Sequence, residues 1–594
     1  MPKSEQEITF KSLFVPFTTK KAVIFIAIIG LIVFFNGLFN NFVRDDISQI
    51  VENSSIKSIW NIPTFFFENR LETGAKTLLG GSYFKPMLDS SFAITYAVFG
   101  ENQFPFHLFQ IIFYITNACL LFILFKHFFR KEISFILSVI FLVHPITNEV
   151  ALYISDTQEV LFLFFGILSL LFLTLFKSKK SVVIASLLLF ISLLSKETGI
   201  LFYCVSFLYV CLFARKKLLL LSMSSVISIS IYAFLRFHAL GNVTQALSNF
   251  PFGRLNLITR ILNIPEIILF YLKTVFLPFN ASASYNWFYT RIDFPHFFLP
   301  LIIDLAFFAF IISFAVILYK KFSRKVFTIY LFFMIWFFLG LVFHLQLIPL
   351  DQTVAGRWFY FPLVGLLGMF GIIMETANFN LKSKWLIIVI IIFIASFSIK
   401  TFTESFNFKD DLTLTNHDFE LSKNSLNSDY NLEYLISYMY YQNNQLKEAK
   451  IHAEKSVQYF PTITNYTNLG AIESSLGNYK DAKNAYEKAL QYGNDSLPYD
   501  NLASLSLAYG NPVRNISFIK NVALRKFSTD GILWFNLAIL QYKQGNVLDA
   551  KKDIEKARKY YPTNPNLDLI DYIIINNKQL NMTVKNGNLN FYTF

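Results

Sequence analysis

Charged residues are scarce in this chain of 594 residues. Asp, Glu, Lys and Arg make up only 15% of the sequence, whereas hydrophobic residues make up 54%. Soluble globular domains carry about 25% charged residues, so this composition excludes an ordinary soluble protein. It also excludes a disordered chain, which needs low hydrophobicity and a high net charge. The class that remains is a polytopic membrane protein with a soluble part attached.

Cysteine is almost absent as well. Cys119, Cys204 and Cys211 are the three cysteines, and all lie inside apolar segments. Neither a disulfide framework nor a zinc site is therefore expected. The formal net charge is +13, but the sequence contains no nucleic-acid motif, so we expect no nucleic-acid partner. Short Lys/Arg clusters between apolar runs are instead typical of a membrane topology signal.

Eleven apolar runs fill the chain up to residue 401. They are 22–43, 104–125, 133–149, 157–176, 181–194, 198–213, 217–238, 297–319, 326–348, 358–375 and 384–401. Basic clusters separate alternate runs, at 126–131, 177–180, 215–217, 320–325 and 382–384. Because basic loops stay in the cytoplasm, this pattern predicts about 11 spans and a cytoplasmic N-terminus at 1–21. The external segments would be 43–103, 144–156, 239–296, 349–357 and everything after about 402.

One further apolar run does not fit this alternation. Residues 261–279 carry Pro265, Glu266, Lys273 and Pro278. If they crossed the membrane, the basic cluster at 320–325 would move outside, against the positive-inside rule. We therefore expect an external interfacial or re-entrant helix here.

A repeat begins after residue 402, where charged and polar residues become more frequent. The segment “NLGAIESSLGNYKDAKNAYEKAL” (468–490) matches “NLAILQYKQGNVLDAKKDIEKAR” (536–558), a shift of 68 residues, or twice 34. Small residues that recur with a 34-residue period are typical of tetratricopeptide repeats. The sequence predicts a linker at 402–429, about four repeats at 430–565 and a cap or tail at 566–594. Such repeats form a binding surface, and the repeat pattern does not identify the partner.

Two adjacent carboxylates, Asp45 and Asp46, directly follow the first apolar run. At a membrane boundary such a pair is unfavourable unless it is solvated, paired or metal-bound. Its position allows either a solvated loop or a general base that faces a cavity in the membrane. Later in the same external segment, Lys85 follows Tyr83 and could bind a phosphate as a point charge, although surface lysines are common.

Other polar residues collect at the remaining external turns. They are His144, Glu149, Asp156 and Glu159 in one turn, Lys196 and Glu197 in the next, Arg236 at a span end, and Arg357 and Tyr360 in the last turn. Each has a structural interpretation, such as a hydrogen-bonded histidine, a lumenal salt bridge, a snorkelling arginine or an interfacial aromatic belt. Four titratable groups in one short turn also favour a functional site.

The order of these motifs resembles a known family. “RDD”, “SYFKP”, “HPITNEV”, “SKETG”, “LRF” and “GRWFYFP” follow one another along the chain. The series is similar to that of the membrane O-mannosyltransferases with tetratricopeptide repeats, and more broadly of the GT-C glycosyltransferases. The resemblance covers 20–365 and 430–565. Two features differ from the family pattern: Lys85 stands in place of an arginine with Phe84 inserted, and “SDTQE” lacks the usual arginine.

The resemblance implies an all-α fold, with a GT-C-type transmembrane helical bundle at 22–401 followed by a tetratricopeptide α-solenoid. It implies an inverting hexosyltransferase. Such an enzyme moves mannose or another hexose from a polyprenyl-phosphate carrier to a hydroxyl group, such as a protein Ser or Thr, outside the cytoplasm. Asp45 and Asp46 would supply the general base. Lys85, Arg236 and Arg357 would hold the donor phosphate. Other cavity residues would be Tyr83, His144, Glu149, Glu159, Lys196, Glu197 and Tyr360.

The cofactor and the compartment are less specified. Because related enzymes include metal-dependent and metal-free members, Mg²⁺ or Mn²⁺ is expected only if Asp45, Asp46 and His144 converge. The composition favours a prokaryotic inner membrane, with the repeats on the periplasmic side presenting a protein or peptide acceptor. Two alternatives remain: a non-catalytic envelope scaffold, and a flippase for polyprenyl-linked sugars, although the internal symmetry typical of transporters is not evident.

Overall fold

The structure is a computed structural model of the chain. It describes residues 17–68, 84–240, 251–278, 283, 285–377, 383–422, 430–493, 495–561, 564, 566–585 and 588–592. The regular secondary structure of these residues is helical, apart from one antiparallel hairpin of β1 (Asn581–Lys585) and β2 (Asn588–Tyr592). The predicted all-α class is confirmed in this sense.

The chain divides into two compact units. The membrane unit comprises Met1–Leu247 and Leu255–Leu421, and the repeat unit comprises Ser248–Arg254 and Ser422–Phe594. Each unit is described by itself below.

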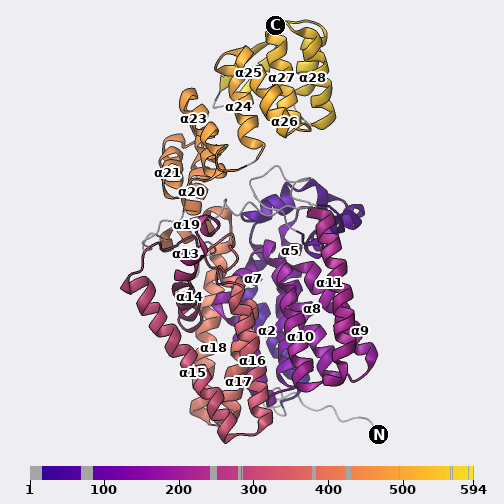
Figure 1. Cartoon of the computed structure of the whole chain (residues 1–594), viewed down its shortest axis with the longest axis vertical. Coiled ribbons are helices and arrows are strands. Elements are labelled where there is room, and N and C mark those ends of the chain that lie inside the picture. The colour runs from indigo at the N-terminus through magenta and orange to yellow at the C-terminus, as the bar shows by residue number, and fades with distance from the viewer. Residues whose placement is uncertain are drawn as a thin grey trace, which may run out of the picture. The chain divides into compact units, whose positions relative to one another are not determined.

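Every apolar run predicted from the sequence coincides with helical structure (Figure 1). The helices are α2 (Thr19–Phe34), α5 (Gln103–Phe125), α6 (Lys131–Val143), α8 (Thr157–Leu175), α9 (Lys179–Ser195), α10 (Ile200–Phe213), α11 (Leu218–Leu240), α15 (Leu299–Lys321), α16 (Arg324–Val342), α17 (Tyr360–Thr376) and α18 (Lys384–Glu404). Polar caps start several of them. The Ser178 side chain, for example, accepts a hydrogen bond from the Ser181 N–H before α9.

Seven helices in the described residues are long and apolar enough to cross a membrane, or eight if α6 and the bent helix after it form one span. This number indicates an integral, multi-pass membrane protein. The helices α2, α9 and α10, with 16, 17 and 14 residues, are shorter than the roughly 20 residues of an untilted span. The finer expectation of about 11 spans therefore stays a prediction.

The bend between α6 and α7 (Asn148–Leu152) follows from Pro145. Proline lacks an N–H and disrupts the helix before it, and the two helical parts meet at 51°. The run at 261–279 forms α14 (Ile264–Phe276), whose 13 residues span only about 20 Å. That is shorter than a membrane core of about 30 Å, so α14 suits the predicted interfacial or re-entrant position.

Antiparallel packing places the turns of the membrane unit at two opposite ends. The helix pairs α5–α6, α8–α9 and α16–α17 pack along their lengths. The Cβ that an alanine would add at Gly365 of α17 would lie 2.5 Å from the Phe337 backbone nitrogen of α16, so only glycine allows this approach. Consequently the predicted basic turns share one end, and the predicted external turns share the other.

Contacts at the basic end confirm this grouping. The Lys126 ammonium donates to the Thr19 hydroxyl at 2.7 Å, and the Arg130 guanidinium pairs with Glu375 at 3.2 Å. These residues come from the start of α2, the α5–α6 turn and the end of α17. Those polar residues predicted to carry function that the structure describes lie at the opposite end.

The structure differs from the expected linker at 402–429. Residues Ser405–Phe408 (η12) and Asp411–Ser422 (α19) are helical, and residues up to Leu421 belong to the membrane unit. The remaining part of that segment, 423–429, lies outside the described residues.

The described residues of the repeat unit form four helix pairs. They are α20 (Tyr430–Gln442) with α21 (Leu446–Tyr459), α22 (Ile463–Ser475) with α23 (Tyr479–Ala489), α24 (Leu497–Ala508) with α25, η13 and α26 (Pro512–Lys526), and α27 (Gly531–Lys543) with α28 (Val547–Tyr560). A final helix, α29 (Leu567–Ile575), covers the last pair. A Cβ at Gly470 would lie 2.4 Å from the Tyr486 ring, which explains why a small residue recurs there.

Candidate active site

The Asp45–Asp46 turn lies at the non-basic end of the membrane unit, between η1 (Asn36–Phe39) and η2 (Ile47–Val51). Asp46 is fully buried, and one of its carboxylate oxygens accepts hydrogen bonds from the Ser155 N–H at 2.7 Å and the Ser155 hydroxyl at 2.6 Å. Its other oxygen accepts from the Val43 N–H at 3.1 Å. Asp45 is only half-buried, and its backbone N–H donates to the Tyr153 hydroxyl at 2.9 Å.

The two carboxylates therefore differ in availability. Asp46 is occupied on both oxygens by the protein itself, whereas Asp45 is partly exposed. Burial raises the pKa of Asp46 to about 7 despite its bonds to Ser155. Burial also raises the pKa of Asp45, against the opposing effects of the Arg357 charge and Tyr153. A half-buried carboxylate with a raised pKa holds a proton more strongly than an ordinary Asp, which suits a general base.

Arg357 lies at the start of η11 (Gly356–Phe359) and pairs with two carboxylates from another part of the chain. Its guanidinium bonds to Glu149 of α7, and its Nε lies 3.6 Å from Asp156. The Arg357 N–H also donates to Glu149 at 3.3 Å. Gly356 permits this approach, because a Cβ there would lie 2.7 Å from the Ile146 carbonyl oxygen. The pair joins the α6–α7 bend to the turn before α17.

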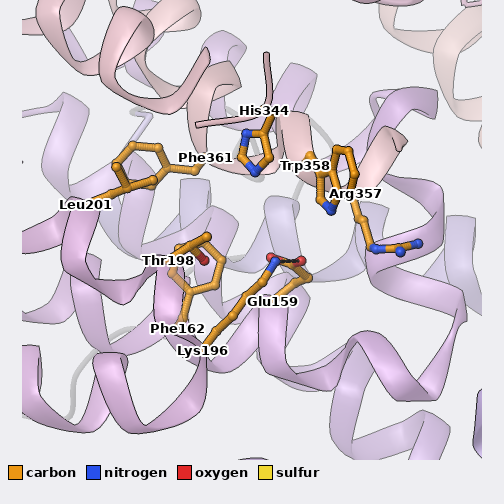
Figure 2. A pocket seen from close by; sticks show the side chains of 9 residues that line it. All are labelled: Glu159, Phe162, Lys196, Thr198, Leu201, His344, Arg357, Trp358 and Phe361. Carbon is orange, nitrogen blue, oxygen red and sulfur yellow. Dashed lines mark hydrogen bonds and ion pairs between the residues drawn. The ribbon is translucent and has the colours of Figure 1, made fainter. Parts of the chain in front are cut away.

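A small pocket of about 10 Å³, room for about one water molecule, lies beside this pair (Figure 2). Its lining combines charged groups with an apolar wall: Glu159, Lys196, Thr198, His344, Arg357, Phe162, Leu201, Trp358 and Phe361. Figure 2 shows the Lys196 ammonium and the Glu159 carboxylate pointing toward each other, and they form an ion pair. Thus three predicted site residues, Glu159, Lys196 and Arg357, line one pocket.

A second group of charges lies around Glu197 of η7 (Glu197–Gly199). The Arg236 guanidinium of α11 pairs with Glu197 at 2.7 Å, and both side chains are over one third exposed. Lys85, just before α4 (Pro86–Phe99), is another electrostatic neighbour of Glu197. Burial lowers the pKa of Lys85 and the Lys196 charge adds to this, whereas the Glu197 charge opposes it. Lys85 and Arg236 are therefore both electrostatic neighbours of Glu197.

The Arg357 group and the Glu197 group are electrostatic neighbours. Asp351, in the loop before α17, acts electrostatically on Asp45 and on Lys85. Glu159 of the pocket also acts on Lys85, and Arg357 acts on Asp45. Segments widely separated in sequence, around 45, 85, 159, 196, 236 and 357, thus meet at one end of the bundle.

Two predicted cavity residues have hydrogen-bond partners within the protein. The His144 ring bonds to the Val275 carbonyl oxygen at 3.0 Å through Nε2 and accepts from the Ile146 N–H at 3.2 Å through Nδ1. Tyr360 is fully buried and accepts a hydrogen bond from the Asn117 amide at 3.2 Å. Both side chains are bonded to other parts of the chain in this structure, and a role in the cavity stays a prediction for both. Tyr83 lies outside the described residues.

The predicted metal ligands do not converge. Asp46 and His144 already have protein partners on the atoms that would bind an ion. In the part of the chain that the structure describes, no group of three His, Cys, Asp or Glu side chains could hold a metal ion. Asp45, Asp46 and His144 are therefore a poor fit to Mg²⁺ or Mn²⁺.

Sequence reasoning missed several residues of this site. Tyr153 and Ser155 hold the acidic turn, and their hydroxyls carry no recognisable pattern. His344 lies in the pocket, where its ring stacks on Trp358 at 5.3 Å and burial lowers its pKa to about 3. Asp351 was recognisable, since it is a charged residue in the same short turn as Arg357.

Comparison with known proteins supports the resemblance seen in the sequence. Residues 85–239 match the family model described as dolichyl-phosphate-mannose-protein mannosyltransferase, and residues 463–492 match a tetratricopeptide repeat model. The human protein O-mannosyl-transferase TMTC3 is 25% identical over 181 residues, and the mouse protein of the same name is 25% identical over 175 residues. These matches cover 29% and 28% of this chain, but only 20% and 19% of the relatives. The predicted resemblance to this combination of domains is confirmed.

Proposed function

We propose that this chain is an inverting GT-C-type membrane glycosyltransferase. It transfers a hexose, with mannose the first candidate, from a polyprenyl-phosphate carrier to a hydroxyl group outside the cytoplasm. The observation that carries the proposal is a group of ion pairs from distant segments at one end of the bundle: Arg357–Glu149, Lys196–Glu159 and Arg236–Glu197. Asp45 and Lys85 are electrostatic neighbours of this group. The mannosyltransferase family model matches 85–239, the segment that supplies three of these cations.

Asp45 is the group best placed to act as the general base. Transfer of a sugar from a lipid phosphate requires removal of a proton from the attacking hydroxyl, and a positioned base contributes about 10²–10⁴-fold. Asp45 is partly exposed, whereas Asp46 is buried and bonded on both oxygens. Asp46 then holds the turn against Ser155. This divides the predicted acidic pair into a base and a positioning residue.

The cations balance the charge of the leaving phosphate. Fixed positive groups that face a developing negative charge stabilise the transition state. Arg357 and Lys196 line the pocket, and Arg236 and Lys85 surround Glu197 beside it. Each pocket cation also has a carboxylate partner, Glu149 or Glu159, which keeps it oriented before the donor arrives. Direct attack by the hydroxyl from the opposite face would invert the anomeric carbon.

Charge distribution supports an external site. The basic turns lie at the opposite end of the membrane unit from Asp45, and basic turns remain in the cytoplasm. The site therefore faces the periplasm if the host is a prokaryote. A Ser or Thr side chain of a protein is the proposed acceptor, since tetratricopeptide repeats bind other proteins.

The test is sugar transfer by the purified full-length protein in liposomes. We would supply polyprenyl-phosphate mannose with a labelled sugar, and parallel donors with glucose or galactose, together with membrane protein extract as acceptor. Wild type should transfer one of these sugars, and Asp45→Asn should lose about 10²–10⁴-fold of the rate. Glu375→Gln, at the basic end, is the matched control and should keep the wild-type rate. No transfer from any donor would favour the envelope scaffold instead.

A further inference from the structure

The residue before the acidic turn has an unusual backbone. Arg44 has φ of +47°, in the left-handed region that residues with a Cβ rarely adopt. Such a conformation persists only where surrounding groups hold it. It occurs directly beside Asp45, so whatever holds Arg44 also sets the direction of the Asp45 side chain.

Two carboxylates of α19 hold Arg44. The Arg44 N–H donates to Asp411 at 3.1 Å, and its guanidinium Nη2 donates to Asp418 at 2.6 Å. Positions 411 and 418 are two helical turns apart and so lie on one face of α19. The Arg44 and Asp418 side chains are 10% and 0% exposed, which makes this a buried ion pair. The other Asp418 oxygen accepts from the Ala283 N–H at 3.1 Å.

The helix α19 is itself tied to the membrane unit. The Asn41 N–H donates to the Lys409 carbonyl oxygen at 2.9 Å, just before the helix begins. His417 lies 3.6 Å from Glu404, which pairs with Lys400 near the end of α18. The anchor for Arg44 is therefore connected to the last apolar helix of the bundle.

The acidic turn is thus fixed from two directions. Tyr153 and Ser155 hold Asp45 and Asp46 from the α7–α8 side. Asp411 and Asp418 hold Arg44 from the α19 side. None of the residues in this second contact lines the pocket, so the contact should influence the direction of Asp45 without touching the donor.

We propose that Asp411 and Asp418 are positioning residues, which hold Arg44 in its left-handed conformation and thereby aim the Asp45 carboxylate at the acceptor hydroxyl. This inference rests on the proposed transferase function. It assigns a task to a helix that sequence patterns placed in a linker. A displacement of about 1 Å at a catalytic group can lower the rate by about 10²-fold, so a small relaxation of Arg44 should be measurable.

The experiment measures kcat and the donor KM of the full-length protein in liposomes. Asp418→Asn should lower kcat by about 10- to 100-fold and leave the donor KM within about twofold. Asp410→Asn is the matched control. Asp410 caps α19 through Thr413, with no hydrogen bond or ion pair to Arg44, and asparagine caps a helix equally well. It should keep the wild-type kcat.

A glycine at position 44 distinguishes positioning from general destabilisation. Glycine adopts the left-handed conformation without a Cβ clash, so the Arg44→Gly variant no longer needs the α19 carboxylate. Asp418→Asn added to Arg44→Gly should therefore cause less than about a twofold further loss of kcat. If the two losses multiply, or if Asp418→Asn changes only the donor KM or nothing, the positioning role is wrong.

Two further outcomes have defined meanings. If Asp418→Asn alone does not fold, the test becomes the comparison of Arg44→Gly with the Arg44→Gly/Asp418→Asn double variant. Equal kcat values in these two variants support the proposal. A lower kcat in the double variant overturns it. If wild type transfers no sugar, the proposed function fails, and the positioning role that rests on it fails with it. An active wild type with an unaffected Asp418→Asn overturns only the positioning role.

Discussion

The two ends of the membrane unit use lysine and arginine differently. At the basic end, Arg130 pairs with Glu375 while both side chains are about one third to one half exposed, and the Lys217 ammonium donates to the Leu173 carbonyl oxygen. At the opposite end, Arg357 and Lys196 pair with Glu149 and Glu159, and all four side chains are at most 13% exposed. The same residue types thus occur in two different environments.

The two pocket pairs are thus far more buried than Arg130–Glu375, whereas the Arg236–Glu197 pair of the candidate site is about as exposed as that basic-end pair. An exposed ion pair contributes about 0–1 kcal/mol. A buried charge that loses its partner can destabilise a protein by about 3–5 kcal/mol. We therefore expect substitutions in the two pocket pairs to change both folding and transfer, and matched substitutions at the basic end to change little.

The largest contrast should come from the two arginines. Arg357→Met leaves Glu149 and Asp156 buried without a cation, so we expect a loss of about 3–5 kcal/mol in stability and of about 100-fold or more in transfer. Arg130→Met should change either quantity by little. Thermal unfolding in detergent and the liposome transfer assay measure the two effects.

Arg357→Lys refines this contrast. Lysine keeps the positive charge but loses the planar fork that can contact two carboxylates, so the rate should recover only in part. If Arg357→Met and Arg130→Met lost equal amounts of stability and of transfer rate, the proposed difference between the two ends would be wrong.

A smaller effect is expected at the second buried pair. Lys196→Met leaves Glu159 buried without its cation and removes the ammonium that lies 5.8 Å from the Phe162 ring centroid. We expect about a tenfold loss of transfer. The double variant Lys196→Met/Glu159→Gln removes both charges and should restore stability, because a buried pair can be replaced by neutral groups without loss. Lys217→Met is the control at the basic end, and a tenfold loss there would contradict the comparison.

The pH dependence of stability tests the Asp46 carboxylate separately. The pKa of Asp46 is about 7 in the folded protein, against about 3.9 in an unfolded chain. Because the folded state binds this proton more tightly, stability should fall as the pH rises from about 4 to about 7 and then level off. The unfolding temperature of Asp46→Asn should fall less between about pH 4 and about pH 7 than that of the wild type. If the two pH profiles are the same, Asp46 does not titrate in that range.

The sequence predicted the elements well because apolar periodicity and repeat spacing are local signals. All eleven apolar runs coincide with helices, and the 34-residue period yields four helix pairs. The sequence also predicted that charged residues near the membrane need partners, but it did not predict which residues these partners are. Arg357 and Glu149 are 208 residues apart, and Arg44 and Asp418 are 374 residues apart. Such pairs depend on tertiary packing, which local patterns do not encode.

The roles of Asp45 and Asp46 likewise depend on tertiary contacts that the sequence pattern does not reveal. Asp45 and Asp46 are indistinguishable as neighbours in the sequence, and the contacts of Ser155 and Val43 with Asp46 separate their roles. His144 likewise looked like a cavity residue because it lies at a helix break, yet its two ring nitrogens are bonded to backbone groups.

The most direct test of this account compares Asp45→Asn with Asp46→Asn in the same transfer assay, at saturating donor and with each variant shown to be folded. Asp45→Asn should lose about 10²–10⁴-fold of the rate because the base is gone. Asp46→Asn should retain measurable transfer, since asparagine can still accept a hydrogen bond from Ser155. Full activity in Asp45→Asn, or a greater loss in Asp46→Asn, would contradict the assignment of Asp45 as the base.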